Sequence, residues 1–284
     1  QKSMSTSNES IIFENNKKRI LKASPALFRD ESGRISGAIV VFQDITESQR
    51  LEEMRKEFVA NVSHELKTPI TTIKSYSETL LCGALEDKEI ARNFVQVIEN
   101  EADRMASLVK DLLQLSHMDF EKVVWDMDHV DLKEIVSDSV KKLEVYFKEK
   151  NQSLVLDQSD DRVPIYADRG KIQQVVINLI SNAIKYTPEN GRIKISTQIV
   201  DKNAIFVVED SGIGIPKEDI NRIFERFYRV DKGRSRAQGG TGLGLSIARN
   251  IIKQHKGNIR VASELEKGSI FSVYFPVDNS VDIL

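Results

Sequence analysis

Residues 58–70 read Phe58-Val59-Ala60-Asn61-Val62-Ser63-His64-Glu65-Leu66-Lys67-Thr68-Pro69-Ile70. Around this stretch, apolar side chains recur in steps of three and four over residues 51–80, which is the periodicity of one face of an α-helix. A helix over 46–81 would be about 54 Å long at ~1.5 Å per residue, and Gly83 follows where a helix-ending glycine is expected. The pattern predicts a long amphipathic helix that carries a histidine beside a carboxylate and is interrupted by Pro69.

A second helical stripe runs from Ile90 to Leu115, again with apolar residues three and four apart. Roughly six residues separate the two helices, so the chain must turn back and form an antiparallel helical hairpin. In an isolated hairpin each helix buries only one face, and the remaining apolar positions would be left in water. Pairing with a second copy would cover them in a four-helix bundle, so we predict a homodimer.

The composition excludes several classes of function. The chain has 284 residues, enough for two or three domains, and its 41 basic residues nearly balance its 43 acidic ones, so nucleic-acid binding is not expected. The single cysteine, Cys82, excludes an internal disulfide and any CxxC metal or redox motif. No apolar run approaches the ~20 residues that span a bilayer, and there is no secretory signal. We therefore expect contact with a membrane only through segments absent from this sequence.

Strand patterns flank the helical region. Residues 11–44 alternate apolar and polar side chains around the turn signal at 30–33, which predicts two strands. Residues 125–128 are interpreted as a connector. From residue 130 onward helical patterns alternate with short strands, and the last strands are expected over 258–263 and 269–275. That order predicts an α/β sandwich with one helical layer over a mixed sheet.

The helix expected over 168–186 carries Asn178 and Asn182 one turn apart on the same face. The carbonyl oxygen of Asn182 suits Mg²⁺, which prefers oxygen ligands and keeps waters and phosphates around it. Lys185 could neutralise a phosphate group, and Tyr186 could lie against a base. Taken alone, this segment could equally be an exposed helix with ordinary amides.

The next chemical motif ends a buried strand over 204–210. Asp210 stands at the strand end, where a buried carboxylate could accept a hydrogen bond from an exocyclic amine such as that of adenine. Gly212 and Gly214 follow, and glycines let the backbone approach a flat ligand closely. A plain turn remains the alternative for this motif by itself.

A second glycine cluster leads into the helix predicted over 243–255. Glycines before a helix expose backbone N–H groups and the positive end of the helix dipole to phosphate. The GxxxxGK[ST] phosphate loop is excluded because no Lys-Ser/Thr pair follows. The basic stretch over 224–236 predicts a lid over the phosphates. The candidate ligand contacts from these segments are Arg229, Lys232, Gly240, Thr241, Gly242, Leu243 and Gly244.

These motifs, in this order and spacing, resemble the sensor histidine kinases of bacterial two-component systems, most closely the WalK- and PhoR-type branch. Residues 63–69 look like the phosphoacceptor box of that family, and 178–186, 210–214, 224–227 and 240–244 look like its nucleotide-binding boxes. The resemblance implies the GHKL, or Bergerat-type, ATP-binding sandwich shared with gyrase B and Hsp90. The chain start resembles the last strands of a truncated PAS sensor domain. The domains expected on this basis are 1–44 (PAS-like strands), 45–57 (signalling helix), 58–125 (dimerisation and histidine phosphotransfer), 126–130 (linker), 131–278 (catalytic ATP binding) and 279–284 (tail).

The resemblance also implies a reaction. His64 would accept the γ-phosphoryl group of ATP, with Mg²⁺ as cofactor, and would pass it to an aspartate on the receiver domain of a response regulator. Glu65 would act as general base, and Thr68 would serve the reverse, phosphatase reaction. A kink is expected beside His64 because Pro69 removes a backbone N–H and crowds the carbonyl of Glu65. The chain would then be the cytoplasmic portion of a cell-membrane sensor kinase.

Two alternatives to this reaction stay open. A gyrase- or Hsp90-like ATPase would hydrolyse ATP with water, but such enzymes place a glutamate where Asn178 stands, and an amide cannot act as a general base. A nucleotide-binding scaffold without kinase activity would use the pocket only to stiffen the helices. His117, His129 and His255 lack the motif that surrounds His64, and we interpret them as structural or incidental.

Overall fold

The computed structural model describes residues 8–14, 17–30, 32–120, 124–158, 161–230 and 240–277. The chain divides into two compact units, residues 1–68 and 69–284. The division falls inside helix α1 (Thr46–Leu81), between Thr68 and Pro69, at the proline that interrupts the helical sequence pattern.

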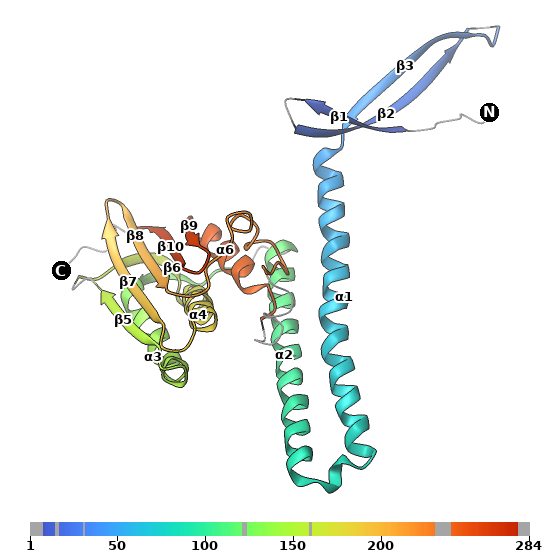
Figure 1. Ribbon diagram of the computed structural model, residues 1–284. Coiled ribbons are helices and arrows are strands. Elements are labelled where there is room, and N and C mark those ends of the chain that lie inside the picture. Colours follow the sequence, from blue (N-terminus) through green and yellow to red (C-terminus); the bar gives the residue numbers. More distant parts are fainter. Residues whose placement is uncertain are drawn as a thin grey trace. The chain divides into compact units, whose positions relative to one another are not determined.

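Three strands form the sheet of the first unit (Figure 1). β1 (Asn8–Glu14), β2 (Lys17–Arg29) and β3 (Ile35–Asp44) are antiparallel and lie in that order. At the β2–β3 turn, Asp30 Oδ1 accepts a hydrogen bond from the backbone N–H of Arg34 at 2.9 Å, and Gly33 takes a φ of 78° that favours glycine. The two expected strands are confirmed, and β1 is an additional strand paired with β2. The likeness to a PAS domain stays a prediction.

Helix α1 starts at a side-chain cap. Asp44 Oδ1 accepts from the backbone N–H of Thr46 at 3.0 Å, which satisfies a donor that the helix itself cannot pair. The hydroxyl oxygen of Thr46 accepts from the N–H of Ile20 at 2.8 Å, so the helix start is tied to β2. The helix runs over the residues that its periodicity predicts, with Pro69 buried inside it.

The second unit begins with the end of α1, the short helix η1 (Ala84–Glu86) and helix α2 (Lys88–Phe120). Gly83 takes a φ of 123° where α1 ends, and Asp87 Oδ1 accepts from two backbone N–H groups in the first turn of α2. The rings of Tyr76 and Phe94 pack edge to face, with their centroids 4.8 Å apart. The predicted antiparallel hairpin is therefore confirmed for this part of α1 and α2.

The apolar side chains of α2 divide between two faces. Leu108 and Leu115 are 3% and 1% exposed, whereas Val109 and Leu113 are 44% and 57% exposed. One face is thus buried within the single chain and the other is left in water. The exposed row is consistent with the predicted homodimer, which stays a prediction.

The rest of the second unit is an α/β sandwich (Figure 1). Its sheet has the order β5-β7-β8-β10-β9, in which β5 and β7 are parallel and the other pairs antiparallel. Helices α3, α4 and α6 pack against the sheet, which confirms the predicted fold class. The elements are β4 (Met127–Asp131), α3 (Leu132–Glu149), β5 (Ser153–Gln158), β6 (Pro164–Asp168), α4 (Arg169–Tyr186), β7 (Arg192–Val200), β8 (Asn203–Asp210), α6 (Gly244–Gln254), β9 (Asn258–Glu264) and β10 (Gly268–Pro276).

The expected linker at 126–130 contains a strand. β4 pairs antiparallel with β6, with Val130 opposite Ile165, and the pair forms a separate two-stranded sheet. Five residues offered too little periodicity to predict a strand, and its partner lies more than thirty residues downstream.

The core lies between the helices and the sheet. Ile193 and Ile195 alternate with less buried residues along β7 and are fully buried, as is Phe206 on β8. Val176 and Ile180 of α4 are also fully buried. Each such side chain contributes about 1.5–3 kcal/mol by leaving water, so α4 is fixed firmly on the sheet and can hold the polar residues of its other face in place.

His255 has a structural role, which is one of the two interpretations, structural or incidental, that its sequence context left open. It is 4% exposed, its Nε2 accepts from the backbone N–H of Asp168 at 3.1 Å, and its Nδ1 lies 2.8 Å from the carbonyl of Ile251. Both contacts are satisfied by the neutral ring with the proton on Nδ1. Asp168 in turn caps α4, because its Oδ1 accepts from the N–H of Lys171.

Candidate nucleotide and phosphoacceptor sites

The two asparagines of the first nucleotide motif lie on α4 and are both half-buried. Asn178 Nδ2 donates to the carbonyl of Gly244, at the start of α6, at 3.2 Å. The structure therefore brings together the asparagine motif and the second glycine cluster, 66 residues apart. Asn182, one turn further along, is also half-buried, and its amide oxygen is of the kind that Mg²⁺ accepts.

Two side chains that the sequence analysis missed hold the end of α4. Lys150 Nζ donates to the carbonyls of Ile184 and Lys185 at 2.8 and 3.0 Å. Gln152 Nε2 donates to the carbonyls of Ile184 and Thr187 at 3.0 and 2.8 Å. These bonds satisfy carbonyls that the last turn of a helix leaves unpaired, and they fix the backbone that carries Lys185.

Asp210 is a buried acid at the end of β8, as predicted. It is 7% exposed, and its Oδ1 accepts from the N–H of Gly212 at 2.8 Å. Burial raises the pKa of the Asp210 carboxyl above its usual value, and the backbone N–H groups of Gly212 and Ser269 act in the opposite direction. The carboxylate is held in place by backbone donors and partly stripped of water, which strengthens any further hydrogen bond that it accepts.

Gly214 has no room for a side chain. Its φ is 69°, and a Cβ there would overlap the carbonyl oxygen of Glu264. Gly212 is similarly enclosed, because a Cβ would come within 2.7 Å of the carbonyl oxygen of Tyr186. The two glycines allow the loop after β8 to pass close to the end of α4 and to β9, so their spacing has a packing reason beside any contact with a ligand.

Cationic side chains gather around Lys185, near the end of α4. Burial, followed by the charges of Arg229, Arg104 and Lys150, lowers the pKa of Lys185 to about 8. A Cβ on Gly240 would lie 2.5 Å from Lys185 Nζ, so the lysine reaches the second glycine cluster. Cations that lie close together repel one another, and a bound polyanion would offset this repulsion. The group is therefore suited to binding a polyanion.

The second glycine cluster leads into α6 as predicted. Thr241 Oγ1 accepts from the N–H of Leu243 at 3.3 Å, and Gly242 takes a φ of 72°. Leu243 is fully buried, so it serves the core, and any ligand contact that it makes is through its backbone. Lys232 lies outside the described residues, as does the rest of the predicted lid from residue 231 to residue 236.

The phosphoacceptor motif lies on α1 in the first unit. His64 is exposed and Glu65 and Thr68 are half-buried. Thr68 Oγ1 donates to the backbone carbonyl of His64 at 3.3 Å. Since Pro69 has no N–H, the helix cannot pair the carbonyl of Glu65 in the usual way. The exposed His64 thus lies next to a part of α1 that lacks one backbone hydrogen bond.

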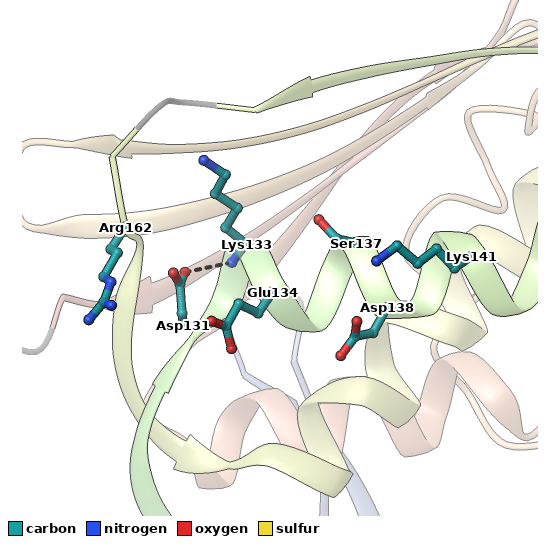
Figure 2. Close-up of a pocket in the computed structure, with 7 residues that line it drawn as sticks. All are labelled: Asp131, Lys133, Glu134, Ser137, Asp138, Lys141 and Arg162. Atoms are coloured by element: carbon teal, nitrogen blue, oxygen red, sulfur yellow. Dashed lines mark hydrogen bonds between the residues drawn. The ribbon is translucent and has the colours of Figure 1, made fainter.

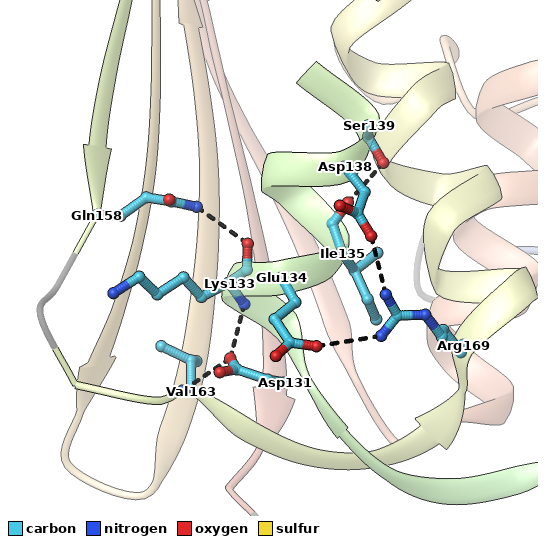
Figure 3. Close-up of polar contacts among 9 residues, drawn as sticks. All are labelled: Asp131, Lys133, Glu134, Ile135, Asp138, Ser139, Gln158, Val163 and Arg169. Atoms are coloured by element: carbon cyan, nitrogen blue, oxygen red, sulfur yellow. Dashed lines mark hydrogen bonds and ion pairs between the residues drawn. The ribbon is translucent and has the colours of Figure 1, made fainter. Parts of the chain in front are cut away.

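A hollow of about 370 Å³ near the start of α3 contains none of the predicted site residues (Figure 2). Several of its lining residues make polar contacts with structural partners (Figure 3). Asp131 Oδ1 accepts from the N–H groups of Lys133 and Val163, and Arg169 pairs with Glu134 at 3.5 Å and with Asp138 at 2.9 Å. The Arg169 ion pairs join α4 to α3, whereas the Asp131 contacts cap the start of α3 and connect it to the residue before β6.

Neither a cluster of metal-binding side chains nor a membrane-spanning helix is found among the described residues. In that part of the chain no group of three or more His, Cys, Asp or Glu side chains could hold a metal ion. No helix there combines the length and the apolar character that crossing a membrane requires.

Two sequence families match this chain. The His Kinase A (phospho-acceptor) domain matches residues 54–121, and the histidine kinase-, DNA gyrase B- and HSP90-like ATPase matches residues 167–279. The fold and the sites thus define a phosphoacceptor helical hairpin followed by an ATPase-type domain.

Known proteins agree with this assignment. The sensor histidine kinase WalK of Bacillus subtilis (strain 168) is 41% identical over 259 residues, which are 90% of this chain and 42% of that protein. The Acinetobacter baumannii histidine kinase AdeS has a TM-score of 0.61 and 31% identity, covering 76% of this chain and 98% of that one. The crystal structure of the histidine kinase ThkA in complex with the response regulator protein TrrA has a TM-score of 0.66 and 28% identity, covering 96% of this chain and 79% of that one.

The chain belongs to the sensor histidine kinase family, as its motifs indicated. It spans less than half the length of the WalK proteins of Bacillus subtilis and Staphylococcus saprophyticus, of which it covers 42% and 45%.

Proposed function

We propose that this chain binds ATP, transfers the γ-phosphoryl group to His64, and passes it to an aspartate of a response regulator. The observation that carries the proposal is that one chain contains a buried carboxylate, Asp210, a group of cations around Lys185, and an exposed helical histidine, His64. The carboxylate can accept a hydrogen bond from the adenine amine of ATP, and the cations can bind its phosphates.

Asp210 would accept a hydrogen bond from the adenine amine, and Tyr186 would lie against the base. Lys185 and Arg229 would contact the phosphates, together with the N–H groups at the start of α6. Asn182 fits Mg²⁺ because its half-buried amide oxygen lies on the helix that carries Lys185. When bound, Mg²⁺ would neutralise charge on the phosphate oxygens.

The transfer step requires a neutral imidazole. One ring nitrogen of His64 would use its lone pair to form the N–P bond, while the bond from the γ-phosphorus to the ADP oxygen breaks. Glu65 would take the proton from the other ring nitrogen. Exposure of His64 supports this role, because a phosphoacceptor must be reached both by ATP and by the partner that takes the phosphoryl group.

Hydrolysis of ATP by water is disfavoured. Asn178 stands where a gyrase-like ATPase would carry its glutamate base, and its amide nitrogen donates to the carbonyl of Gly244. An amide cannot remove a proton from water, so ATP held at this site is directed to another nucleophile.

Thr68 would serve the dephosphorylation of the response regulator by orienting a water molecule. Its hydroxyl donates to the carbonyl of His64, so it would have to rotate away from the helix backbone for this task. The receiver domain of a response regulator is the partner that we propose for this chain, and the complex of ThkA with TrrA supports the class of partner. A Thr68→Ala variant is expected to lose phosphatase activity and keep autophosphorylation, and full phosphatase activity in that variant would rule out this role.

We also propose that the chain works as a homodimer. The exposed apolar row on α2 supports a second copy as the partner of the helical hairpin. We further propose that the chain is the cytoplasmic part of a membrane sensor, and its likeness to the WalK sensor kinases supports this. A monomeric mass at micromolar concentration would contradict the dimer.

The test of the proposed function uses γ-labelled ATP with the wild type and a His64→Gln variant. The wild type is expected to take up label that acid removes, because a phosphoramidate is labile in acid, and the variant is expected to take up none. Rapid ATP hydrolysis by the His64→Gln variant would instead support the ATPase alternative.

A further inference from the structure

Helix α2 packs along one face against the ATP-binding domain, within the second unit. Gln114 and Gln174 of α4 exchange two amide hydrogen bonds, at 2.8 and 2.7 Å. Asn250 of α6 donates to the sulfur of Met118 at 3.5 Å, and Leu115 between them is 1% exposed. This helix belongs to the phosphotransfer part of the sequence, so a side chain on this face can act on the nucleotide site from outside that domain.

Asp111 lies on the same face and touches the second glycine cluster. Its Oδ2 accepts a hydrogen bond from Thr241 Oγ1 at 2.9 Å, although the two residues are 130 positions apart. The same hydroxyl oxygen accepts from the N–H of Leu243, immediately before α6. The carboxylate is thus connected through one side chain to the loop whose N–H groups would receive phosphate.

The charge of Asp111 matters because of where it lies. The start of α6 carries the positive end of a helix dipole, and Leu243 at the cap position has no side-chain hydrogen bond to the helix. Burial raises the pKa of the Asp111 carboxyl, against the effects of the Thr241 hydroxyl and of Lys110, so this carboxylate is partly stripped of water. A poorly screened anion beside an anion-binding loop repels a second anion.

We propose that Asp111 opposes the binding of nucleotide phosphates at the second glycine cluster while α2 is packed on the ATP-binding domain. The Asp111–Thr241 contact and the bound triphosphate then compete, so nucleotide binding loosens α2 and packing of α2 weakens nucleotide binding. By linkage the two effects have the same size. This inference rests on the proposed function, in which the cluster binds the phosphates of ATP.

The test is the dissociation constant of a non-hydrolysable ATP analogue with Mg²⁺, measured on the full chain. Asp111→Asn keeps the volume and an oxygen acceptor for Thr241 but removes the charge. We expect this variant to bind at least about fivefold more tightly than the wild type, the lower end of typical coupling between sites. Asp103→Asn is the matched control, because it makes the same change at an exposed position of the same helix, and it should leave binding unchanged.

Unchanged or weaker binding by Asp111→Asn would overturn the inference, and so would equal tightening by the Asp103→Asn control. A second readout is amide hydrogen exchange over residues 104–118 of the wild type, which should become faster when the analogue binds. Unchanged or slower exchange would contradict the competition. If neither the wild type nor Asp111→Asn binds the analogue, the proposed function fails and this inference fails with it.

Discussion

The lowered pKa of Lys185 makes nucleotide affinity depend on pH in the mildly alkaline range. The ammonium group loses its proton near pH 8 in the free protein, because burial and three neighbouring cations disfavour its charge. A phosphate ligand favours the protonated form. The affinity for ATP is therefore highest below this pKa and falls as the pH rises through it. Linkage requires this direction, because the ligand binds the protonated form of Lys185 more tightly than the neutral form.

The size of the effect follows from the protonated fraction. With a pKa of about 8, about three quarters of the Lys185 side chains are protonated at about pH 7.5 and about one tenth at about pH 9. The dissociation constant for an ATP analogue should thus rise about eightfold between about pH 7.5 and about pH 9, if the neutral amine contributes nothing. Burial also raises the pKa of the nearby Tyr186 hydroxyl, so this group does not add a titration in the same window.

Calorimetry or a fluorescent nucleotide analogue across this range would measure the effect. Lys185→Arg is the matched control, because a guanidinium keeps its charge at all these pH values and should remove the dependence. Lys185→Met should bind weakly at every pH. A flat profile in the wild type, or a fall that persists in Lys185→Arg, would refute the assignment of the pH dependence to this side chain.

Three further substitutions test separate parts of the structure. Asp210→Asn should weaken ATP binding about 10- to 100-fold, as expected when a charged acceptor worth about 1.5–3 kcal/mol is lost, while thermal unfolding stays unchanged or shifts upward; retained affinity would contradict the adenine contact. His255→Leu leaves the N–H of Asp168 without its acceptor. It should therefore lower the free energy of unfolding, measured in urea, by about 1–3 kcal/mol. An unchanged urea midpoint would count against the structural role of His255. Gly214→Ala should cost at least about 1 kcal/mol of stability, because its φ is positive and its space is filled. The control is Gly170→Ala, in the first turn of α4, where the nearest atom to an added Cβ is 3.5 Å away; it should be neutral or stabilising by up to about 1 kcal/mol. Equal effects of the two substitutions would refute the packing argument.

The sequence predicted the elements that depend on local patterns. The long helix 46–81 follows from its three- and four-residue apolar spacing, and Asp210 with its glycines follows from a motif of five consecutive residues. The two asparagines share a helix face because helical geometry fixes residues four apart. Such features are set by neighbours in the chain, so one sequence is enough to predict them.

The sequence could not predict contacts made across long distances in the chain. Lys150 holds the carbonyls of Ile184 and Lys185, more than thirty residues away, and Asp111 meets Thr241 across 130 residues. Nothing in the local pattern of either residue sets it apart from an exposed helical charge. The apolar periodicity of α2 likewise predicts one apolar face, whereas the structure divides its apolar side chains between a buried and an exposed face. Periodicity does not tell which partner covers each side of a helix.

Localising the phosphoryl group is the most direct test of the central claim. The chain contains four histidines, His64, His117, His129 and His255, so the test separates the phosphoacceptor from three internal controls. The full chain would be incubated with ATP and Mg²⁺, digested at neutral to alkaline pH, and its peptides analysed by mass spectrometry for phosphohistidine. The account predicts phosphohistidine only in the peptide that contains His64. Phosphate on another histidine or on a hydroxyl side chain, or no phosphorylated peptide from a chain that binds ATP, would contradict it.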